Sequence, residues 1–352
     1  MQKAVLRMIA WEVTRSCNLA CVHCRASAER GPYPNELSTE ECKELLKRVT
    51  GFAQPTIILT GGEPLVRGDI FEIAAHGSHL GLRMVMAPNG TLVTPEIARR
   101  MVEVGIQRIS ISLDAASADK HDSFRGVPGA FQGAIAGIRA AKEAGLPFQI
   151  NSTITRINHD QIKEILRMAV EMGAAALHIF LLVPTGRAEE MKDQELSPQD
   201  YEKTLHWFYE QRDRFPLALK ATCAPHYYRI LRQRARQEGK EVNTEAYGLD
   251  AVTRGCLGGI SFCFISHVGK VQPCGYLELD CGNVRNEAFQ RIWEESPVFR
   301  KLRDVDGYEG KCGYCEFRHV CGGCRARAYS ITGNYLAEEP YCVYQPTRGP
   351  SS

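Results

Sequence analysis

The sequence predicts an α/β protein, a partial (β/α)6 barrel followed by a small cysteine-rich domain. In the first two-thirds of the chain, short runs of strand-like composition alternate with segments whose apolar residues recur at helical spacing. Such alternation gives a parallel sheet covered by helices, and six repeats rather than eight favour an open barrel. After residue 215, glycine, cysteine and short strands dominate. A segment of that composition has a small apolar core, so it needs additional cross-links, such as metal clusters, to be stable.

The repeats follow one another in a regular order. Strands are expected at 7–14, 56–60, 83–87, 107–113, 148–153 and 176–183, with helices at 38–50, 69–80, 94–104, 130–144 and 160–172. Ser38, with Glu41 three residues later, forms a capping box that marks the start of the first helix. We expect the active site where the strands end, because parallel strands bring their carboxyl ends to one rim.

Three segments divide the expected fold. Residues 1–214 form the barrel with a bridging helix at 197–214, residues 215–345 form the cysteine-rich domain, and residues 346–352 form a loose tail. The six strand–helix repeats supply one large apolar core, and a chain of this length can bury a core of that size.

Composition and charge exclude several classes of function. The net charge of +2 gives no electrostatic case for nucleic acid or a membrane as a partner. No apolar run reaches the ~18 residues of a membrane span, and residues 1–13 lack a signal-peptide pattern, so a cytoplasmic protein is expected. Fourteen cysteines are far more than packing requires. In a reducing compartment, closely spaced cysteines favour metal sites over disulfides.

The first cysteine group, Cys17, Cys21 and Cys24, directly follows the first expected strand. Three thiolates can bind three irons of a cubane and leave the fourth iron open to a ligand, as an open catalytic zinc site does. The alternative is a zinc knuckle in which His23 is the fourth ligand. His23 lies between two of the cysteines, which is a poor arrangement for one tetrahedral centre.

The Cys-x3-Cys-x2-Cys spacing after the first strand, together with Gly61-Gly62-Glu63-Pro64 after the second, resembles the radical S-adenosylmethionine (SAM) superfamily. The resemblance extends over residues 7–187. It implies that Cys17, Cys21 and Cys24 hold a [4Fe-4S] cluster that reductively cleaves SAM to start radical chemistry. It also implies a low-potential electron donor, such as flavodoxin or ferredoxin, and anaerobic operation.

The same resemblance implies a set of SAM contacts. The Gly61–Pro64 turn would bind the amino group, since two glycines let the backbone approach and Glu63 can accept from an ammonium. An ordinary tight turn or strand end remains the alternative at these positions, and Asn89 could simply form a turn. The implied cofactor-binding residues are Gly61, Gly62, Glu63, Pro64, Asn89, Ser112 and Asp114 (ribose), Arg125 (carboxylate) and Asn151.

The second cysteine group resembles the SPASM extension of radical SAM enzymes, which implies two auxiliary [4Fe-4S] clusters. By that analogy one cluster takes Cys256, Cys263, Cys274 and Cys324, and the other takes Cys312, Cys315, Cys321 and Cys342. Two residues separate the pair Cys321 and Cys324, where the family often has three. Without Cys263 the first cluster would keep an open iron. Zinc on Cys312, Cys315, Cys321 and Cys324 is the alternative, because two close cysteine pairs are a common zinc arrangement.

Three cysteines remain outside this scheme. Cys42 and Cys223 are expected to pack as ordinary buried side chains, because neither has a closely spaced cysteine partner. Cys281 lies within the second group, and its role as a ligand stays open.

The segments 8–17, 24–28 and 321–329 resemble the heme-forming branch of the superfamily, the heme b synthases of the siroheme-dependent pathway. This implies oxidative decarboxylation of two propionates of Fe-coproporphyrin III to vinyl groups. An auxiliary cluster would accept the electron that leaves when each vinyl forms. The alternatives are the sister enzyme that deacetylates didecarboxysiroheme and a peptide- or protein-modifying enzyme such as a sulfatase maturase.

A tetrapyrrole substrate with four carboxylates needs cationic partners. Arg25 and Arg187 lie beside expected site elements, and guanidinium groups bind propionates with two hydrogen bonds. Arg325 and Arg327 are weaker candidates, and a structural ion pair is the alternative for each. His178 could ligate heme iron, although a core histidine is the more common role. The basic run 228–236 is expected to be a solvated helix face.

Overall fold

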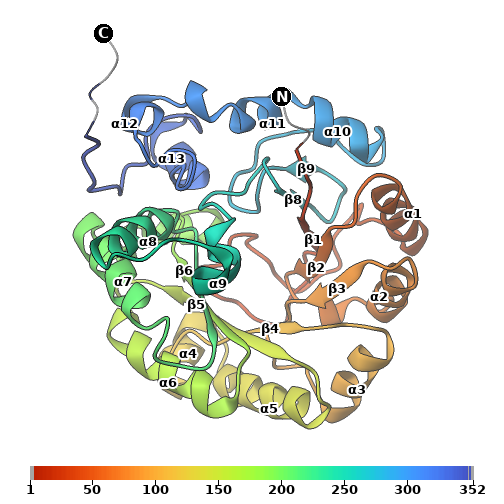
Figure 1. Cartoon of the computed structure of the whole chain (residues 1–352). Coiled ribbons are helices and arrows are strands. Elements are labelled where there is room, and N and C mark those ends of the chain that lie inside the picture. Colours follow the sequence, from red (N-terminus) through yellow and green to blue (C-terminus); the bar gives the residue numbers. More distant parts are fainter. Residues whose placement is uncertain (1–3, 348, 350–352) are drawn as a thin grey trace.

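One curved sheet organises the molecule. The computed structural model describes residues 4–347 and 349, in which nine strands are ordered β7-β6-β5-β4-β3-β2-β1-β8-β9. All neighbouring strands are parallel except β8 and β9, and the sheet bends into an open barrel (Figure 1). The strands are β1 (Met8–Thr14), β2 (Thr56–Gly61), β3 (Arg83–Met86), β4 (Ile109–Ser112), β5 (Phe148–Ile154), β6 (Ala176–Leu181), β7 (Ala218–Thr222), β8 (Phe262–Ile265) and β9 (Val271–Gln272).

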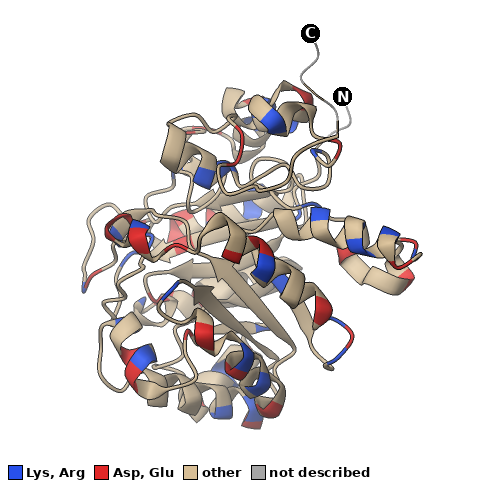
Figure 2. Ribbon diagram, turned by 90° about the vertical axis from the view of Figure 1, so that its left-hand side faces the viewer, with Lys and Arg blue, Asp and Glu red and all other residues tan. Residues whose placement is uncertain are grey.

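Helices surround the barrel, and those nearest the C-terminus gather above one side of it (Figure 1). Among the described residues, none of the helices is long and apolar enough to cross a bilayer. Figure 2 shows acidic and basic residues interspersed along the outer helices. The helices are α1 (Thr39–Thr50), α2 (Ile70–His79), α3 (Pro95–Glu103), α4 (Ala118–Arg125), α5 (Ala130–Glu143), α6 (Ile162–Met172), α7 (Pro198–Glu210), α8 (His226–Gln237), α9 (Thr244–Tyr247), α10 (Phe289–Glu295), α11 (Pro297–Arg303), α12 (Gly310–Tyr314) and α13 (Arg325–Thr332).

The expected α/β barrel is confirmed, and all six predicted strands are present. The first helix begins as predicted, because the Ser38 side chain accepts from the Glu41 amide while the Glu41 side chain accepts from the Ser38 amide. Successive side chains of each strand point to opposite faces of the sheet. In β1, Ile9, Trp11 and Val13 pack in the main core against the helices. The residues between them, such as Glu12, face the barrel interior.

Several features differ from the sequence-based expectation. The sheet continues past the expected boundary at residue 214, because β7 pairs with β6 and β8 pairs with β1. Helix α8 is 12 residues long and amphipathic, in a region where no such helix was expected. Its basic run is not simply solvated, since Arg229 is 3% exposed and is paired with Glu202 at 2.6 Å.

The expected tail is only partly described. Residues 348 and 350–352 lie outside the described part of the chain. Thr347 is not loose, because its hydroxyl donates to Glu316 at 3.1 Å. Pro346 lines a pocket together with cysteines of the second group. The described part of this segment therefore contacts the cysteine-rich domain.

Candidate functional site

The loop that leaves β1 brings the first cysteine group together. Cys17, Cys21 and Cys24 belong to one small apolar cluster with Leu19 and Ala28. Burial, with smaller effects from the charges of Glu63, Cys21 and Cys24, raises the pKa of Cys17 to about 11, although the Leu19 amide opposes the shift. The Cys17 thiol would therefore stay protonated at neutral pH unless a metal centre binds and displaces the proton.

Each of the three sulfurs accepts a hydrogen bond. The amide of Leu19 donates to Cys17 Sγ at 3.4 Å, and the amide of Ala28 donates to Cys24 Sγ at 3.4 Å. Arg125 Nη1 donates to Cys21 Sγ at 3.7 Å. Such donors stabilise negative sulfur and adjust the reduction potential of an iron–sulfur cluster. The donor set thus fits a cluster held by three thiolates.

The zinc-knuckle alternative receives no support from the geometry of His23. Its ring is buried and stacks on Phe124 of α4, with the ring centroids 4.2 Å apart. Burial lowers the pKa of His23 well below its usual range, and the nearby Arg125 lowers it further.

Arg187 holds the cysteine loop in place. Its Nε donates to the carbonyl of Cys21 and its Nη1 to the carbonyl of Ala28, both at 2.8 Å. The backbone amide of Arg187 also donates to the carbonyl of Cys24 at 3.0 Å. We expected Arg187 to bind substrate. The structure shows two of its side-chain donors on the backbone around the cysteines, so Arg187 positions the loop, and a contact with substrate stays a prediction.

Arg25 also has protein partners. Its Nη1 pairs with buried Glu12 at 3.2 Å, and its guanidinium lies 4.4 Å over the ring of Phe264. Glu12 in turn accepts from His267 Nδ1 at 2.7 Å. The pKa of Glu12 is lowered to about 2 although burial raises it, because His267, Arg25 and Arg15 stabilise the carboxylate.

The Gly61–Pro64 turn is attached to the start of the cysteine loop. The amide of Gly62 donates to the carbonyl of Thr14 and that of Glu63 to the carbonyl of Ser16, both at 2.9 Å. A Cβ atom on Gly62 would lie 2.4 Å from the Ser16 carbonyl oxygen. Only glycine therefore allows this close backbone approach.

Glu63 is fully buried and joins this turn to the loop after β3. Its Oε2 accepts from the amide of Asn89 at 2.6 Å, and its Oε1 accepts from the amide of Leu65 at 3.0 Å. Burial raises the pKa of Glu63 to about 7, although both amides oppose the shift. A bound ammonium group would favour the ionised form.

Asn89 connects to the cysteine loop through residues that the sequence did not single out. Its Nδ2 donates to Asn18 Oδ1 at 2.7 Å, and Asn18 Nδ2 donates to Thr91 Oγ1 at 2.9 Å. Asn18 lies between Cys17 and Cys21. No pattern in the sequence links positions 18, 89 and 91, since the contacts form only on folding.

Asp114 and Arg125, expected at the ribose and the carboxylate of SAM, form a buried ion pair with each other. Asp114 Oδ1 also accepts from the amide of Thr153 at 2.7 Å. Arg125 Nε is buried without a hydrogen-bond partner among the described residues, so it could receive an anionic group. Ser112 and Asn151 are register partners on β4 and β5, inside the barrel.

In the second cysteine group, the structure brings Cys274 and Cys324 together with Cys223 rather than with Cys263. These three pack around one apolar cluster that includes Val183. Burial raises the pKa of Cys223 well above its usual range, and the charges of Cys324, Cys274 and Cys256 raise it further. Cys223, Cys256, Cys274 and Cys324 are therefore close enough for their charges to interact.

The surroundings of Cys263 favour packing in the core over the predicted role as a ligand. Cys263 lies on β8 in the main core, fully buried. Burial raises the pKa of its thiol, and Cys281 is the one cysteine whose charge adds to the shift. Cys223 was missed because it has no closely spaced cysteine partner. Its position directly after β7, at the rim where site residues gather, would have identified it if β7 itself had been predicted.

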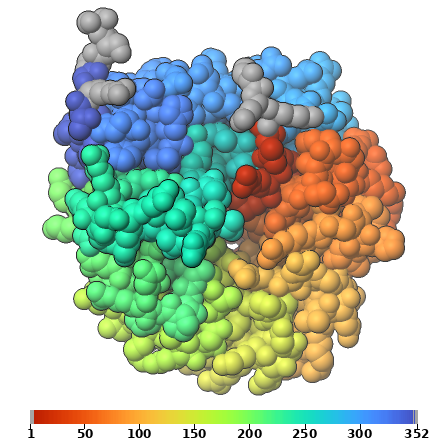
Figure 3. All heavy atoms as spheres, viewed as in Figure 1, coloured from red at the N-terminus to blue at the C-terminus, as the bar shows by residue number. Residues whose placement is uncertain are grey.

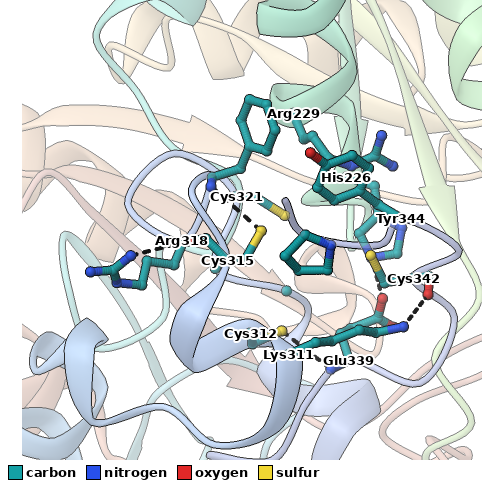
Figure 4. Close-up of a pocket in the computed structure, with 14 residues that line it drawn as sticks. His226, Arg229, Lys311, Cys312, Cys315, Arg318, Cys321, Glu339, Cys342 and Tyr344 are labelled. Atoms are coloured by element: carbon teal, nitrogen blue, oxygen red, sulfur yellow. Dashed lines mark hydrogen bonds and ion pairs between the residues drawn. The ribbon is translucent and has the colours of Figure 1, made fainter. Parts of the chain in front are cut away.

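The remaining cysteines line a separate pocket that opens to solvent. Cys312, Cys315, Cys321 and Cys342 border it, with His226, Arg229 and Lys311 nearby (Figure 4). Amides donate to two of the sulfurs, from Glu339 to Cys312 and from Phe317 to Cys315, both at 3.4 Å.

Cys324 is not part of this pocket lining, so the structure separates it from Cys321. That division disfavours a single zinc ion on Cys312, Cys315, Cys321 and Cys324. In the part of the chain that the structure describes, no three Cys, His, Asp or Glu side chains converge on the position of a single ion.

Residues 24–25 and 274–276 connect the triad to the first auxiliary group. A Cβ atom on Gly275 would lie 3.1 Å from Arg25 Nε, so the guanidinium packs closely against the backbone of Gly275. The buried phenol of Tyr276 has a raised pKa, chiefly through burial and then through the charge of Cys223, with smaller effects from Cys274 and Cys24. The two cysteine sets are thus neighbours.

The other expected substrate residues lie elsewhere. His178 is inside the barrel, where its Nδ1 lies 3.0 Å from Gln149 Nε2, and burial lowers its pKa to about 3. Arg325 and Arg327 are buried, and they donate to backbone carbonyls such as Ala337 at 2.6 Å and Leu182 at 2.7 Å.

Known proteins resemble the chain over almost its whole length. It matches the radical SAM superfamily over residues 11–169 and the SPASM iron–sulfur cluster-binding domain over residues 256–324. It is 57% identical over 342 residues to the AdoMet-dependent heme synthase of Nitratidesulfovibrio vulgaris, covering 97% of this chain and 93% of that protein. The AdoMet-dependent heme synthase of Methanosarcina barkeri is 53% identical, with 97% of each chain covered. The Fe-coproporphyrin III synthase of the same organism is 32% identical, covering 95% and 87%.

Solved structures share the fold. Streptococcus suis SuiB bound to S-adenosylmethionine superposes with a TM-score of 0.77 at 15% identity, covering 97% of this chain and 78% of that one. Native anSMEcpe with bound AdoMet gives a TM-score of 0.69 at 19% identity, covering 96% and 94%. The chain therefore belongs to the radical SAM superfamily, as an enzyme of radical chemistry with a SPASM iron–sulfur domain and with AdoMet-dependent heme synthases among its relatives.

Proposed function

We propose that this enzyme converts Fe-coproporphyrin III to heme b by oxidative decarboxylation of two propionates. The observation that carries the proposal is the 57% identity to a protein named AdoMet-dependent heme synthase, over 97% of the chain. Identity falls to 32% for the relative named Fe-coproporphyrin III synthase. The heme synthase reaction is therefore favoured over that of the sister enzyme.

The residues of the triad fit this chemistry. Cys17, Cys21 and Cys24 would hold a [4Fe-4S] cluster, which would supply the electron for the cleavage of SAM and so the radical that attacks a propionate β-carbon. The Gly61–Pro64 turn, Ser112 and Asn151 line the adjoining strand ends and would hold SAM. Arg125 would stabilise negative charge at Cys21 and present its free Nε to the SAM carboxylate.

We also propose two auxiliary clusters in the cysteine-rich domain, which begins after β7. The first would take Cys223, Cys256, Cys274 and Cys324, and the second Cys312, Cys315, Cys321 and Cys342. Loss of CO2 from the substrate radical gives a vinyl group only if one electron also leaves, and the first cluster is the nearer acceptor. A low-potential donor such as flavodoxin or ferredoxin would reduce the triad cluster.

Anaerobic reconstitution tests the proposed reaction. The reconstituted enzyme would be incubated with SAM, a reductant and Fe-coproporphyrin III, and the porphyrins would be followed by mass spectrometry. Two successive losses of CO2 with two hydrogens are expected. Release of 5′-deoxyadenosine with the porphyrin left intact would assign the enzyme to another substrate.

A further inference from the structure

A large cavity lies at the opposite end of the barrel from the cysteine triad. It has a volume of about 1300 Å3 and is lined by the first residues of β1, β2, β6 and β7 and by the segment 246–254. Most small-molecule pockets measure roughly 300–1,000 Å3, so this one could admit a ligand of tetrapyrrole size. Figure 3 looks onto this end of the barrel and shows the surface hollowed at its centre, between the red strand β1 and the green segment of α8 and α9.

The cavity is strongly cationic. Seven Arg and Lys residues line it, whereas Asp250 is the one carboxylate among its lining residues. The whole chain carries a net charge of only +2, so this concentration is local. Positive charge within low-dielectric walls raises the local concentration of an anionic ligand.

Several of these cations have buried donors that the described protein does not satisfy. Arg108 Nε, Arg232 Nη1 and Arg254 Nε are buried without a hydrogen-bond partner in the described residues. Buried N–H groups normally find an acceptor, and a ligand carboxylate would supply one. Lys220 adds a half-buried side chain whose pKa is lowered by desolvation, against the opposing charge of Asp250.

A polar path crosses the barrel interior from this cavity toward the triad. His178 and Lys220 are register partners at the cavity. Gln149 Nε2 lies 3.0 Å from His178 Nδ1 and also donates to Asn151 Oδ1 at 3.0 Å. Asn151 is paired with Ser112, next to the expected SAM contacts. At ~3.3 Å per residue, strands of this length span roughly 20 Å, so a flat macrocycle could reach from one rim to the other.

We propose that this cavity admits the tetrapyrrole and binds those carboxylates that are not reacting, with Arg108 and Lys220 as principal anchors. The inference deepens the proposed function and rests on it. A macrocycle standing in the barrel would present one propionate to the SAM end while the acidic groups on its far edge meet the cations. Cavity cations would thus select a polyacidic porphyrin.

Porphyrin binding to the reconstituted enzyme in the presence of SAM tests the inference. Iron coproporphyrin III would be titrated by its Soret band into the wild type and into the Arg108→Gln and Lys220→Gln variants. Each substitution is expected to weaken binding about tenfold, the typical effect of losing a hydrogen bond between charged partners. Arg108→Lys should restore part of the affinity. Iron content and SAM cleavage without substrate should match the wild type.

A matched control and a neutral ligand separate the outcomes. Arg99→Gln removes an exposed arginine of α3, paired only with Glu96, and should bind like the wild type. The tetramethyl ester of iron coproporphyrin III should bind weakly and equally to all variants. If the wild type binds the acid but both variants match it, the site is wrong while the proposed function stands.

Two further results are decisive even if a variant fails to fold. Equal affinity of the wild type for the acid and its ester would overturn the inference, because the cations would then contribute nothing. Failure of the wild type to bind iron coproporphyrin III at all would overturn the proposed function, and the inference with it.

Discussion

Cys21 illustrates how single residues prepare the triad for a metal cluster. Its sulfur accepts from Arg125, which is itself held by Asp114, while its carbonyl accepts from Arg187. The positive charge of one arginine thus lies beside the thiolate, and a second arginine fixes the backbone. Burial raises the pKa of the Cys21 thiol, and Arg125 opposes that rise. We therefore expect the Cys21 thiol to ionise only when a metal cluster binds its sulfur.

Cys223 and Cys263 allow a direct test of the first auxiliary cluster. We expect Cys223→Ala to lower the iron and sulfide content of the reconstituted enzyme, because a cluster ligand is lost. The decrease should be at most the iron and sulfide of one cluster. Cys263→Ala is the matched control, since it removes an equal side chain from the core and should leave the iron content unchanged. Metal analysis and the visible spectrum measure both. A lowered iron content in Cys263→Ala alone would reverse the assignment.

Glu63 should carry a proton at mildly acidic pH. Its folded-state pKa of about 7 exceeds the usual value of 4.5. The folded chain therefore binds more protons than the unfolded chain between these values, and its stability falls as pH rises through them. The full effect is about 3 kcal/mol at 1.36 kcal/mol per pKa unit.

Infrared difference spectroscopy can detect that proton. We expect a protonated carboxyl band that persists to about pH 7 in the SAM-free wild type and is missing in Glu63→Gln. Bound SAM should shift the band to lower pH, because its ammonium favours the carboxylate. A band lost near pH 4.5 would show that the carboxyl is not desolvated.

At the scale of elements, hydrophobic periodicity predicted the six strands and the helices between them, because each has one face against the main core. Strand β7 was not predicted, and it forms by pairing with β6. Strand β8 pairs with β1 although about 250 residues separate them. Such long-range pairing leaves no local signal, so Cys223 and the true extent of the sheet needed the structure.

The loop between β1 and α1 depends on the segment after β6. Arg187→Gln should loosen this loop, because a charged donor to the carbonyls of Cys21 and Ala28 is lost. Each such hydrogen bond contributes about 1.5–3 kcal/mol. We expect faster release of iron from the triad to a chelator, with unchanged release from the auxiliary sites. Arg229→Gln is the complementary control, since Arg229 borders the Cys312 pocket instead. Equal release of triad iron in wild type and Arg187→Gln would leave Arg187 free for substrate.

Across the whole molecule, the sequence motifs identified the two ends of the proposed electron path, and the folded chain brings those two ends into contact. Cys24-Arg25 and Cys274-Gly275 meet where the guanidinium lies against the glycine backbone. The Cys312 pocket is separate from the first auxiliary group and is lined by residues of α8 and α12. From this arrangement we predict that the triad cysteines affect SAM cleavage and that the auxiliary cysteines affect product formation.

The final prediction separates SAM cleavage from product formation. Cys24→Ala should abolish SAM cleavage, because the triad loses a ligand. Cys274→Ala and Cys315→Ala should still cleave SAM but accumulate little heme, because the electron that leaves with each vinyl group has lost part of its route. The ratio of 5′-deoxyadenosine to vinyl product, measured by chromatography, should therefore rise in both variants. Cys42→Ala is the control, since Cys42 is buried in the core and should keep the wild-type ratio. If Cys315→Ala keeps that ratio while Cys274→Ala does not, the electron leaves from the first auxiliary group and the outer pocket has another role.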